Sequence, residues 1–555
     1  MPRALSPEPV SSKATSRKSG QPAREILAVL AAWVVMSLIL ATLAWPNRCA
    51  PGLYYDEAVD AGLAKDFVKG HVTGTHMPGT QTVSLFGRPF PLFVQWYFGA
   101  VKPWLIIPSF MLFDCTVPVL RLTSLFWYLV GLLLFMLWVR KLLGLSASLI
   151  AAPILAFDPS FFFPCIVDWG PVIPGFLCRV GGYYLLIRWW RHGRMHDGLL
   201  GAFALGLGFF CKIDFVVILV GCGVATAIAY GKEVLASFRN FPRKYALFCL
   251  GFLVAASPMA LHISYIFREV SGTGHPKRGS ELLEKVNTAW AMYDGSYFFR
   301  LMNVGGRFDT MFTHFCPVWS PFGWVVIFAG ILLVVRINQR SSEAAEKRRL
   351  AFLLFSTVLI TLGVVLLPGA VRIHHWLLVC PFPHLIVVAA IVMLWTRSPV
   401  SVVRKWSMRT CALAMALAVI GGHLVAIAQT QSLIAASGGR GWWSDSIAEL
   451  CHDVEDQRGL TLVSLDWGFN EQLLFLCDNQ QFLEPLWSGQ AVPASATSVY
   501  LVHPPAYALF PAGLAYCHAL QRAYPKNITV RPYKDRQGNV AFYAVRLREN
   551  TSGAR

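Results

Sequence analysis

Charged residues are scarce in this chain of 555 residues. They make up 14% of it, whereas an ordinary soluble domain carries about 25%, and hydrophobic residues reach 55%. A surface that is wetted on all sides needs more charge than this, so a soluble single-domain enzyme is excluded. Disorder is excluded as well, because the long apolar runs must be buried in something. We expect a lipid bilayer to be their solvent.

Acidic residues are too few to balance the basic ones. The chain has 30 Asp and Glu against 48 Lys and Arg, which leaves a net charge of +18. Basic stripes often bind nucleic acid, but here the basic residues form short clusters between apolar runs, as in the cytoplasmic loops of polytopic membrane proteins. We therefore expect no nucleic-acid partner. The thirteen cysteines contain no Cys-x-x-Cys pair, so they carry no zinc or redox signature.

The apolar runs and their flanking charges predict a mostly α-helical, polytopic membrane protein with about 11 transmembrane helices. With the basic clusters inside, the N-terminus is cytoplasmic and the C-terminus lies outside. The expected spans are about 26–45, 119–139, 145–157, 170–187, 198–211, 215–231, 245–267, 318–335, 350–367, 376–395 and 410–429.

Three parts follow from this topology. Residues 1–24 are predicted to be a disordered basic cytoplasmic tail, and residues 25–430 the transmembrane domain with outer loops 46–118, 158–169 and 268–316. Residues 431–555 contain alternating segments typical of strands and predict a small extracytoplasmic α/β domain. The run from Trp96 to Phe113 is broken by a lysine and two prolines, so we expect an interfacial or re-entrant helix rather than a span.

Two adjacent carboxylates, Asp56 and Glu57, follow the first span by about ten residues. Such a pair just above a membrane suits a general base and an electrostatic or metal-binding neighbour. The structural alternative is an acidic helix start, since carboxylates are favourable in a first turn.

A second acidic segment contains Asp158 and Asp168, at the outer ends of two predicted spans. An ionisable residue there is costly unless it is wet, paired or functional. Asp158 precedes a proline and could simply end a helix. Asp168 stands beside Trp169, and a carboxylate next to an aromatic plane suits a polar ring such as a sugar.

Cationic candidates lie on the same predicted face. Lys212 follows the fifth span, and Arg372, His374 and His375 follow the ninth. Lys and Arg bind the phosphate of a lipid at this depth, although terminal cations also snorkel to the interface, and Asp214 could simply pair with Lys212. Neighbouring histidines on a helix point in different directions, which speaks against a metal site formed by the pair. Arg179, midway through the fourth span, needs a buried partner that the sequence does not name.

These motifs together resemble the GT-C superfamily of membrane glycosyltransferases. The match is to bacterial relatives of protein O-mannosyltransferases and of the lipid A aminoarabinose transferase (glycosyltransferase family 39-like), over about residues 26–400. It rests on the order and sidedness of short motifs: Tyr55-Asp56-Glu57, Val119-Leu120-Arg121-Leu122, Asp158-Pro-Ser and Asp168-Trp-Gly-Pro. The segment that begins at Tyr97 looks like the interfacial helix of the family's first loop.

The resemblance implies an inverting transfer of a sugar from a polyprenyl-phosphate donor to a hydroxyl acceptor on the outer face. Asp56 would then be the general base, while Glu57 and Asp168 would orient the acceptor or stabilise positive charge on the sugar. Lys212 and Arg372 would offset the charge of the departing phosphate. The tryptophans Trp96, Trp104 and Trp169 would stack on the sugar or form an interfacial belt.

The acceptor and the metal dependence stay open at this stage. Some relatives have a His-Pro-Pro segment where this chain has Gly87-Arg88-Pro89-Phe90-Pro91, so a lipid, a glycan and a protein hydroxyl all remain acceptors to test. Some branches of the superfamily use a divalent cation and others do not. The alternative functions are a transporter or flippase for a lipid-linked sugar and a ligase-like transferase of the O-antigen type that would depend on Arg372 and the two histidines.

The resemblance also implies a location. A bacterial inner membrane with a periplasmic active face is expected, with membrane lipids as neighbours. Cys451, Cys477 and Cys517 would then lie in an oxidising space and could form a disulfide, whose pairing the sequence does not determine.

Overall fold

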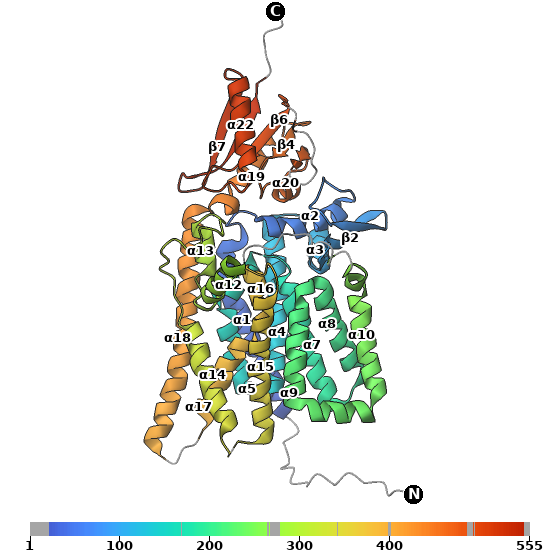
Figure 1. Ribbon diagram of the computed structural model, residues 1–555, viewed down its shortest axis with the longest axis vertical. Coiled ribbons are helices and arrows are strands. Elements are labelled where there is room, and N and C mark those ends of the chain that lie inside the picture. The colour runs from blue at the N-terminus through green and yellow to red at the C-terminus, as the bar shows by residue number, and fades with distance from the viewer. Residues whose placement is uncertain are drawn as a thin grey trace, which may run out of the picture.

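The computed structural model describes residues 21–548 apart from 168, 264–265, 267–277, 341, 398–400, 486–491 and 493. A tall bundle of helices forms the lower part of the molecule (Figure 1). A layer of shorter helices and a small sheet covers the upper end of this bundle, and a mixed α/β unit stands above that layer.

Each of the eleven predicted spans falls on a helix of the bundle. The helices are α1 (Gln21–Ala44), α4 (Val117–Leu143), α5 (Leu145–Ala156), α7 (Val172–His192), α8 (Met195–Cys211), α9 (Val216–Asn240), α10 (Pro242–Leu261), α14 (Phe322–Asn338), α15 (Ala344–Leu366), α17 (Phe382–Thr396) and α18 (Val402–Ser437). The expected polytopic, mostly α-helical membrane protein is confirmed.

Fewer helices pass a strict test of length and apolarity. Among the described residues six do so by themselves, and up to eight if each of two bent pairs counts as one span. The bent pairs are α5 with α6 (Pro159–Ile166), at 69°, and α16 (Ile373–Trp376) plus η3 (Leu377–Val379) with α17, at 41°. Helices α8 and α14 are apolar but only 17 residues long, about 26 Å against a hydrocarbon core of about 30 Å.

Two expected boundaries shift or fall outside the described residues. Helix α1 begins at Gln21, inside the stretch 1–24 that was predicted to be a tail, because Pro22 is tolerated in a first helical turn. Residues 1–20 lie outside the described part, as do 268–277 of the expected outer loop 268–316. The rest of that loop contains α12 (Arg278–Tyr293) and α13 (Tyr297–Asn303).

The first outer loop forms the covering layer. It follows η1 (Trp45–Arg48) and contains α2 (Tyr55–Lys69), the antiparallel strands β1 (Gln81–Leu85), β2 (Arg88–Gln95) and β3 (Phe98–Gly99), and α3 (Val101–Leu112). Strands β1 and β2 are joined by Phe86 and Gly87, which both have positive φ as a two-residue hairpin turn of type I′ requires. The sequence did not reveal this hairpin, because a bulky phenylalanine takes the position where Asn or Asp is usual. Helix α3 has 12 residues, about 18 Å, and is too short to span, as predicted.

The α/β unit above the layer confirms the small C-terminal domain expected from the alternating segments. Its sheet has the order β5-β4-β6-β8-β7, with β4 parallel to β5 and β6, and with β8 antiparallel to β6 and β7. The strands are β4 (Thr461–Ser464), β5 (Gln481–Leu483), β6 (Ser498–Val502), β7 (Ile528–Lys534) and β8 (Val540–Leu547), and the helices are η4 (Gly441–Trp443), α19 (Ser446–Val454), α20 (Asn470–Leu476) and α22 (Pro511–Ala523).

Helix α18 connects the bundle to this unit. It has 36 residues, about 54 Å, so it continues well beyond a bilayer and rises past the covering layer (Figure 1). It ends at Gly438, whose φ of 68° forms a left-handed C-cap. The disulfide of the unit joins Cys451 to Cys477, while Cys517 is a buried free thiol.

Candidate active site

The start of α2 is fixed by a buried ion pair. Arg121 of α4 binds both oxygens of Glu57, from Nε to Oε1 at 2.7 Å and from Nη2 to Oε2 at 2.8 Å. The same guanidinium donates to the carbonyls of Asn47, Pro51 and Gly52, which lead into the helix. Arg121 is 1% exposed and Glu57 is not exposed at all. The Arg-Leu motif of the second span and the second acid of the first loop therefore form one structural clamp.

Asp56 is the residue that this clamp presents. From Pro51 to Phe67 every side chain is buried except Asp56, which is half-buried. Its Oδ2 accepts a hydrogen bond of 2.7 Å from the indole Nε1 of Trp169. Burial raises the pKa of Asp56 above its ordinary value, although the Trp169 hydrogen bond and the charges of Lys102 and Lys212 act in the opposite direction. A half-buried carboxylate with a raised pKa suits a general base.

Trp169 is the centre of an aromatic wall around this carboxylate. The indole is fully buried and lies 5.5 Å from the ring of Tyr54, 5.2 Å from Phe298 and 5.7 Å from Trp443. Its ring also lies 6.1 Å from the imidazole of His374. Trp169 thus connects the acidic motif of the first loop with the histidines before α17.

Two other predicted tryptophans belong to a different cluster. Trp104 donates from Nε1 to the carbonyl of Pro91 and packs against Phe90 and Phe210. Trp96 packs against Tyr97 within the first loop. The rings of Trp96 and Trp104 therefore pack against other residues of the covering layer, and Trp104 also packs against Phe210 of α8. Neither ring is among those that surround Trp169.

The predicted cations converge below Asp56. Lys212 pairs with Asp214 at 3.2 Å, and Asp214 accepts a 2.8 Å hydrogen bond from Nδ1 of His375. The second nitrogen of His375 lies 3.1 Å from Nε2 of His374. The positive charges of Lys212 and Arg372 both act on His374. The alternative that Asp214 pairs with Lys212 is correct, and the pair lies inside the same cluster.

Arg372 approaches the cluster from the other side. Its Nη1 binds Glu284 at 2.7 Å, and its guanidinium lies 3.5 Å from the ring centroid of Phe308. The side chain remains 31% exposed, so donors are still accessible to an anion. Next to it, the hydroxyl of Tyr297 accepts a hydrogen bond from the backbone of Ile373.

Arg179 finds the buried partners that the sequence could not name. It donates to the carbonyls of Leu377 and Leu378, at 3.3 and 2.7 Å, where the short helices before α17 end and leave carbonyls unpaired. It lines a cavity of about 30 Å³ together with Lys212, Asp214 and His374. This volume holds a water molecule but not a sugar. Arg179 therefore supports the segment that carries the histidines.

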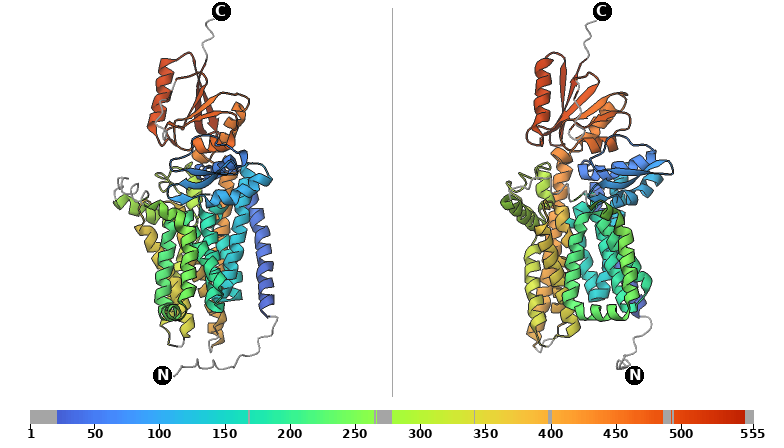
Figure 2. Two further views of the ribbon diagram at one scale, coloured as in Figure 1. Left: turned by 90° about the vertical axis from the view of Figure 1, so that its right-hand side faces the viewer. Right: turned by 45° about the vertical axis from the view of Figure 1, so that its right-hand side comes forward.

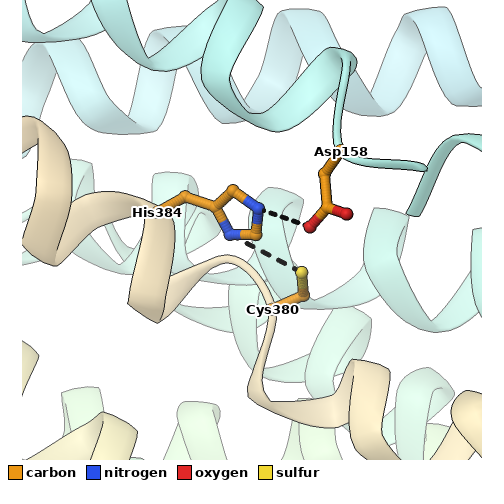
Figure 3. Close-up of side chains that lie close together, drawn as sticks. All are labelled: Asp158, Cys380 and His384. Carbon is orange, nitrogen blue, oxygen red and sulfur yellow. Dashed lines mark hydrogen bonds and ion pairs between the residues drawn. The ribbon is translucent and has the colours of Figure 1, made fainter. Parts of the chain in front are cut away.

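Asp158 lies apart, in a cluster of its own. Its Oδ1 caps α6 by accepting from the backbone of Ser160, and its Oδ2 lies 2.9 Å from Nε2 of His384 (Figure 3). The other ring nitrogen of His384 lies 3.7 Å from the sulfur of Cys380. Asp158 is 2% exposed. The sequence left two interpretations of Asp158, a helix terminator and a candidate site residue. In the structure its carboxylate is buried, and each of its oxygens has a partner.

These three side chains are the one group of His, Cys and acidic residues in the described part of the chain that could hold a metal ion. Cys, His and Asp together are ligands typical of Zn²⁺. One ligand atom from each of the three lies within 4.8 Å of the other two, and the two nitrogens of His384 face different partners, Asp158 and Cys380 (Figure 3). Asp56 belongs to no such group among the described residues.

Asp168 lies outside the described residues. Its neighbour Trp169 is placed, as are the other predicted site residues Asp56, Glu57, Asp158, Lys212, Arg372, His374 and His375. The structure brings Asp56, Trp169, Lys212, Arg372 and His374 to one site, whereas Glu57 and Asp158 face other partners.

Several site residues were not predicted. Asp60, one helical turn after Asp56 along α2, forms a buried ion pair with Lys102 at 2.8 Å. From the sequence, Lys102 was interpreted only as an interruption of an apolar run. Tyr97 contributes its carbonyl to Ile213 beside Lys212, and the charge of Asp56 reaches its hydroxyl. The sequence did contain a signal for the pair of Lys102 and Asp60: a lysine within a run of apolar residues requires a buried acidic partner.

The C-terminal unit closes the site from above. Trp443 stacks on Tyr54 with ring centroids 3.9 Å apart, and Trp467 packs against Tyr55 at 4.7 Å. Gln472 donates to the carbonyl of Leu53. The unit thus contacts the first turn of α2 and covers the inner side of the aromatic wall, a contact that no local sequence pattern indicated.

Comparisons with known proteins agree with this architecture. Residues 99–262 match the family described as dolichyl-phosphate-mannose-protein mannosyltransferase. No curated protein matches this chain. The fold is similar to that of the oligosaccharyltransferase of Archaeoglobus fulgidus tethered with an acceptor peptide, at 14% identity and a TM-score of 0.53, over 91% of this chain and 69% of that one. ArnT from Cupriavidus metallidurans bound to undecaprenyl phosphate matches at 12% identity and a TM-score of 0.47, over 94% and 99%.

The resemblance to GT-C membrane glycosyltransferases is therefore confirmed at the level of the fold. The family match adds sequence support for α3 to α10, the segment that contains Trp169 and Lys212.

Proposed function

We propose that the protein is an inverting glycosyltransferase that moves a sugar from a polyprenyl-phosphate donor to a hydroxyl acceptor on the outer face of the membrane. The observation that carries this proposal is the position of Asp56, a half-buried carboxylate at the top of an apolar helix bundle, next to an aromatic wall and above a cluster of cations. The shared fold and the family match, whose description names a dolichyl-phosphate sugar, support a glycosyltransferase with a lipid-phosphate donor.

In the proposed reaction the acceptor oxygen attacks the anomeric carbon of the sugar. The bond from this carbon to the phosphate oxygen breaks as the new glycosidic bond forms, and the phosphate takes the bonding electron pair. Asp56 accepts the proton of the acceptor hydroxyl. Because Trp169 occupies Oδ2, the other oxygen, Oδ1, is the one that receives the proton.

The departing phosphate gains negative charge, which requires cationic groups that are already in place. We assign this task to Lys212 and Arg372, whose positive charges both act on His374. Both have a carboxylate partner, Asp214 and Glu284, which fixes their positions without closing off every donor. His375 holds His374 through the contact between their rings.

The other acidic residues take positioning roles in this mechanism. Glu57 gives both oxygens to Arg121 and fixes the turn that presents Asp56. Asp158 caps α6 and binds His384, so it shapes the region beneath Trp169 without contacting the substrate. We assign the stabilisation of positive charge on the sugar to Asp168, on the strength of its place beside Trp169 in the sequence.

We further propose that the upper end of the molecule faces the periplasm of a bacterial inner membrane. Basic residues flank the lower ends of the bundle helices, as the positive-inside rule requires, for example Arg140 and Lys141 at the end of α4 and Arg191 near the end of α7. The disulfide between Cys451 and Cys477 lies in the upper unit, where an oxidising compartment suits it.

The experiment is sugar transfer by purified protein supplied with a panel of polyprenyl-phosphate sugars and with lipid, glycan and peptide acceptors. Asp56→Asn is compared with Asp114→Asn, an exposed aspartate of the same outer loop. We expect Asp56→Asn to lose at least about 100-fold in donor turnover while donor binding persists, and Asp114→Asn to behave as the wild type.

Unchanged turnover in Asp56→Asn would refute the proposed base. If in addition Arg372 and His374 proved essential, the ligase-like alternative would replace this mechanism. A protein that moves a lipid-linked sugar across proteoliposome membranes and transfers none would be a flippase.

A further inference from the structure

A second cavity extends from Leu219, near the start of α9, down to Arg191, near the end of α7 at the lower end of the bundle. Its volume is about 710 Å³, and it is lined by α4, α7, α8, α9, α10 and α15. This volume falls in the range of about 300–1,000 Å³ that is typical of ligand sites. The cavity is therefore far larger than the space of about 30 Å³ beneath the candidate active site.

The arginine end of the cavity is distant from the candidate active site. Trp169 precedes the first residue of α7, whereas Arg191 stands next to the last residue and lines the cavity. Arg191 follows Val172 by 19 residues along this helix, which corresponds to about 30 Å. This is the thickness of the hydrocarbon core of a membrane, so the arginine end of the cavity lies at the level of the leaflet opposite to Asp56.

The lining of the cavity has two chemical parts. The walls are aromatic and aliphatic, for example Trp138, Leu205, Phe248 and Phe252, and the hydroxyls come mainly from tyrosines. Two guanidiniums, Arg191 and Arg349, lie at the lower end. An apolar chamber with cations at one end matches a molecule that has a hydrocarbon chain and an anionic headgroup.

The two guanidiniums retain free donors. Arg191 gives one hydrogen bond to the carbonyl of Lys141, and Arg349 donates to the carbonyls of Leu142 and Ala345. Both side chains thus converge on the last turn of α4. Within the described residues neither has a carboxylate partner, whereas Arg348 pairs with Glu233. Each guanidinium has five N–H groups, so most of its donors remain for a phosphate.

Helix α9 is kinked where it lines the lower part of the cavity. Tyr230 has φ −136° and ψ 15°, which breaks the helix within the cavity wall. Beyond this break the remaining part of α9 lies across the lower end of the bundle instead of continuing along it (Figure 2). Arg191 is exposed and Arg349 is half-buried, so a headgroup can reach the arginines while its chain lies between α7, α9 and α10.

We propose that this cavity binds a membrane lipid with an anionic phosphate headgroup, whose phosphate is held by Arg191 and Arg349 and whose hydrocarbon chain fills the apolar chamber. The lipid comes from the leaflet that faces the basic loops. It is distinct from the sugar donor, because its headgroup binds at the end of α7 opposite to the one that Trp169 precedes. The proposal does not depend on the function of the upper site.

Binding of phosphatidylglycerol and of zwitterionic phosphatidylcholine to delipidated, full-length protein in detergent tests this proposal, with native mass spectrometry as the measurement. We expect phosphatidylglycerol to bind at least about tenfold more tightly, because only its headgroup has net negative charge to pair with the guanidiniums. Arg191→Gln combined with Arg349→Gln should remove this preference. Arg348→Gln changes the same kind of charge beside the cavity and should retain it.

A second pair of variants tests the chamber itself. Gly223 lines the cavity, and a Cβ at this position meets no atom within 4 Å. Gly223→Phe should therefore fill the chamber and weaken phosphatidylglycerol binding at least about tenfold, while thermal unfolding shows that the protein is folded. Gly330 of α14 also has open space around it but does not line the cavity, so Gly330→Phe is the matched control.

Equal binding of the two lipids, or unchanged binding in both the arginine and the Gly223 variants, would overturn the proposal. Polyprenyl phosphate provides the last comparison. If Gly223→Phe weakened only polyprenyl phosphate, and the arginine variants had no effect, the chamber would hold the chain of the sugar donor and the proposal would be wrong.

Discussion

Replacing His76 with glutamine removes a positive charge that lies between two buried carboxylates. The Nε2 of His76 lies 2.8 Å from Asp66 of α2, and its Nδ1 lies 2.9 Å from Glu471 of α20. Glu471 also accepts from the backbone of Met77. The imidazolium therefore joins the first outer loop to the C-terminal unit, which covers the candidate active site.

The magnitude follows from the charges around the ring. Burial by itself lowers the pKa of His76, but the charges and hydrogen bonds of Glu471 and Asp66 outweigh it and raise the pKa from 6.5 to about 10. At 1.36 kcal/mol per pH unit, this difference corresponds to about 5 kcal/mol in favour of the charged form. Glutamine leaves the two carboxylates without a counter-charge, so we expect His76→Gln to destabilise the docked unit by about 3–5 kcal/mol.

The dependence on pH has a defined sign. Since the pKa is raised on folding, the stabilisation is fully present below pH 6.5 and is lost as the pH rises through about 10. Docking of the wild-type unit should therefore weaken between these values, whereas docking of His76→Gln should be weak throughout and depend less on pH.

Hydrogen exchange of the backbone amides of α20 and thermal unfolding measure this effect at pH 6 and pH 9.5. His71→Gln is the control, because His71 is an exposed histidine of the same loop. If His76→Gln and His71→Gln had the same hydrogen exchange and the same melting temperature at pH 6, the imidazolium would not be what holds the C-terminal unit on the first outer loop. Equal pH dependence of wild type and His76→Gln would refute the charge argument.

Four further outcomes are expected. Donor turnover should fall on acidification at a pH above the ordinary pKa of aspartate, because burial raises the pKa of Asp56 and only its deprotonated form accepts the proton; a pH profile of kcat/KM checks this. Trp169→Phe removes a hydrogen bond that lowers this pKa, so the acidic limb should move to higher pH, and an unmoved limb would contradict the contact. Arg121→Gln leaves Glu57 buried without its partner and should destabilise the fold by about 3–5 kcal/mol, seen as a lower melting temperature. Lys212→Gln should reduce turnover by about 100-fold with little change in folding, and a change in KM alone would show that Lys212 acts only in binding.

The sequence was a good guide to features that repeat along a helix or a strand. Each predicted span coincides with a bundle helix, because about twenty apolar residues have no other stable environment. The alternating segments of the last hundred residues form strands for an equally local reason. The hairpin at Phe86 and Gly87 was missed, because its turn lacks the residues that usually mark a type I′ turn.

Partners that are distant in the chain could not be predicted. Glu57 and Arg121 are 64 residues apart, and Asp158 and His384 are 226 apart. Each pair forms because the bundle places two buried groups side by side. The same holds for the disulfide, where three cysteines allowed several pairings and the helices α19 and α20 bring Cys451 to Cys477.

The sequence by itself determined that this chain lies in a membrane, where its helices are, and that two adjacent carboxylates follow the first of them. Only the tertiary structure decided which carboxylate is available for chemistry. Asp56 and Glu57 are neighbours on one helix, so they point about 100° apart, and no local pattern states which direction is buried. Packing against α4 buried Glu57 on Arg121 and left Asp56 beside Trp169, because an unpaired carboxylate at that depth would be far more costly than a paired one.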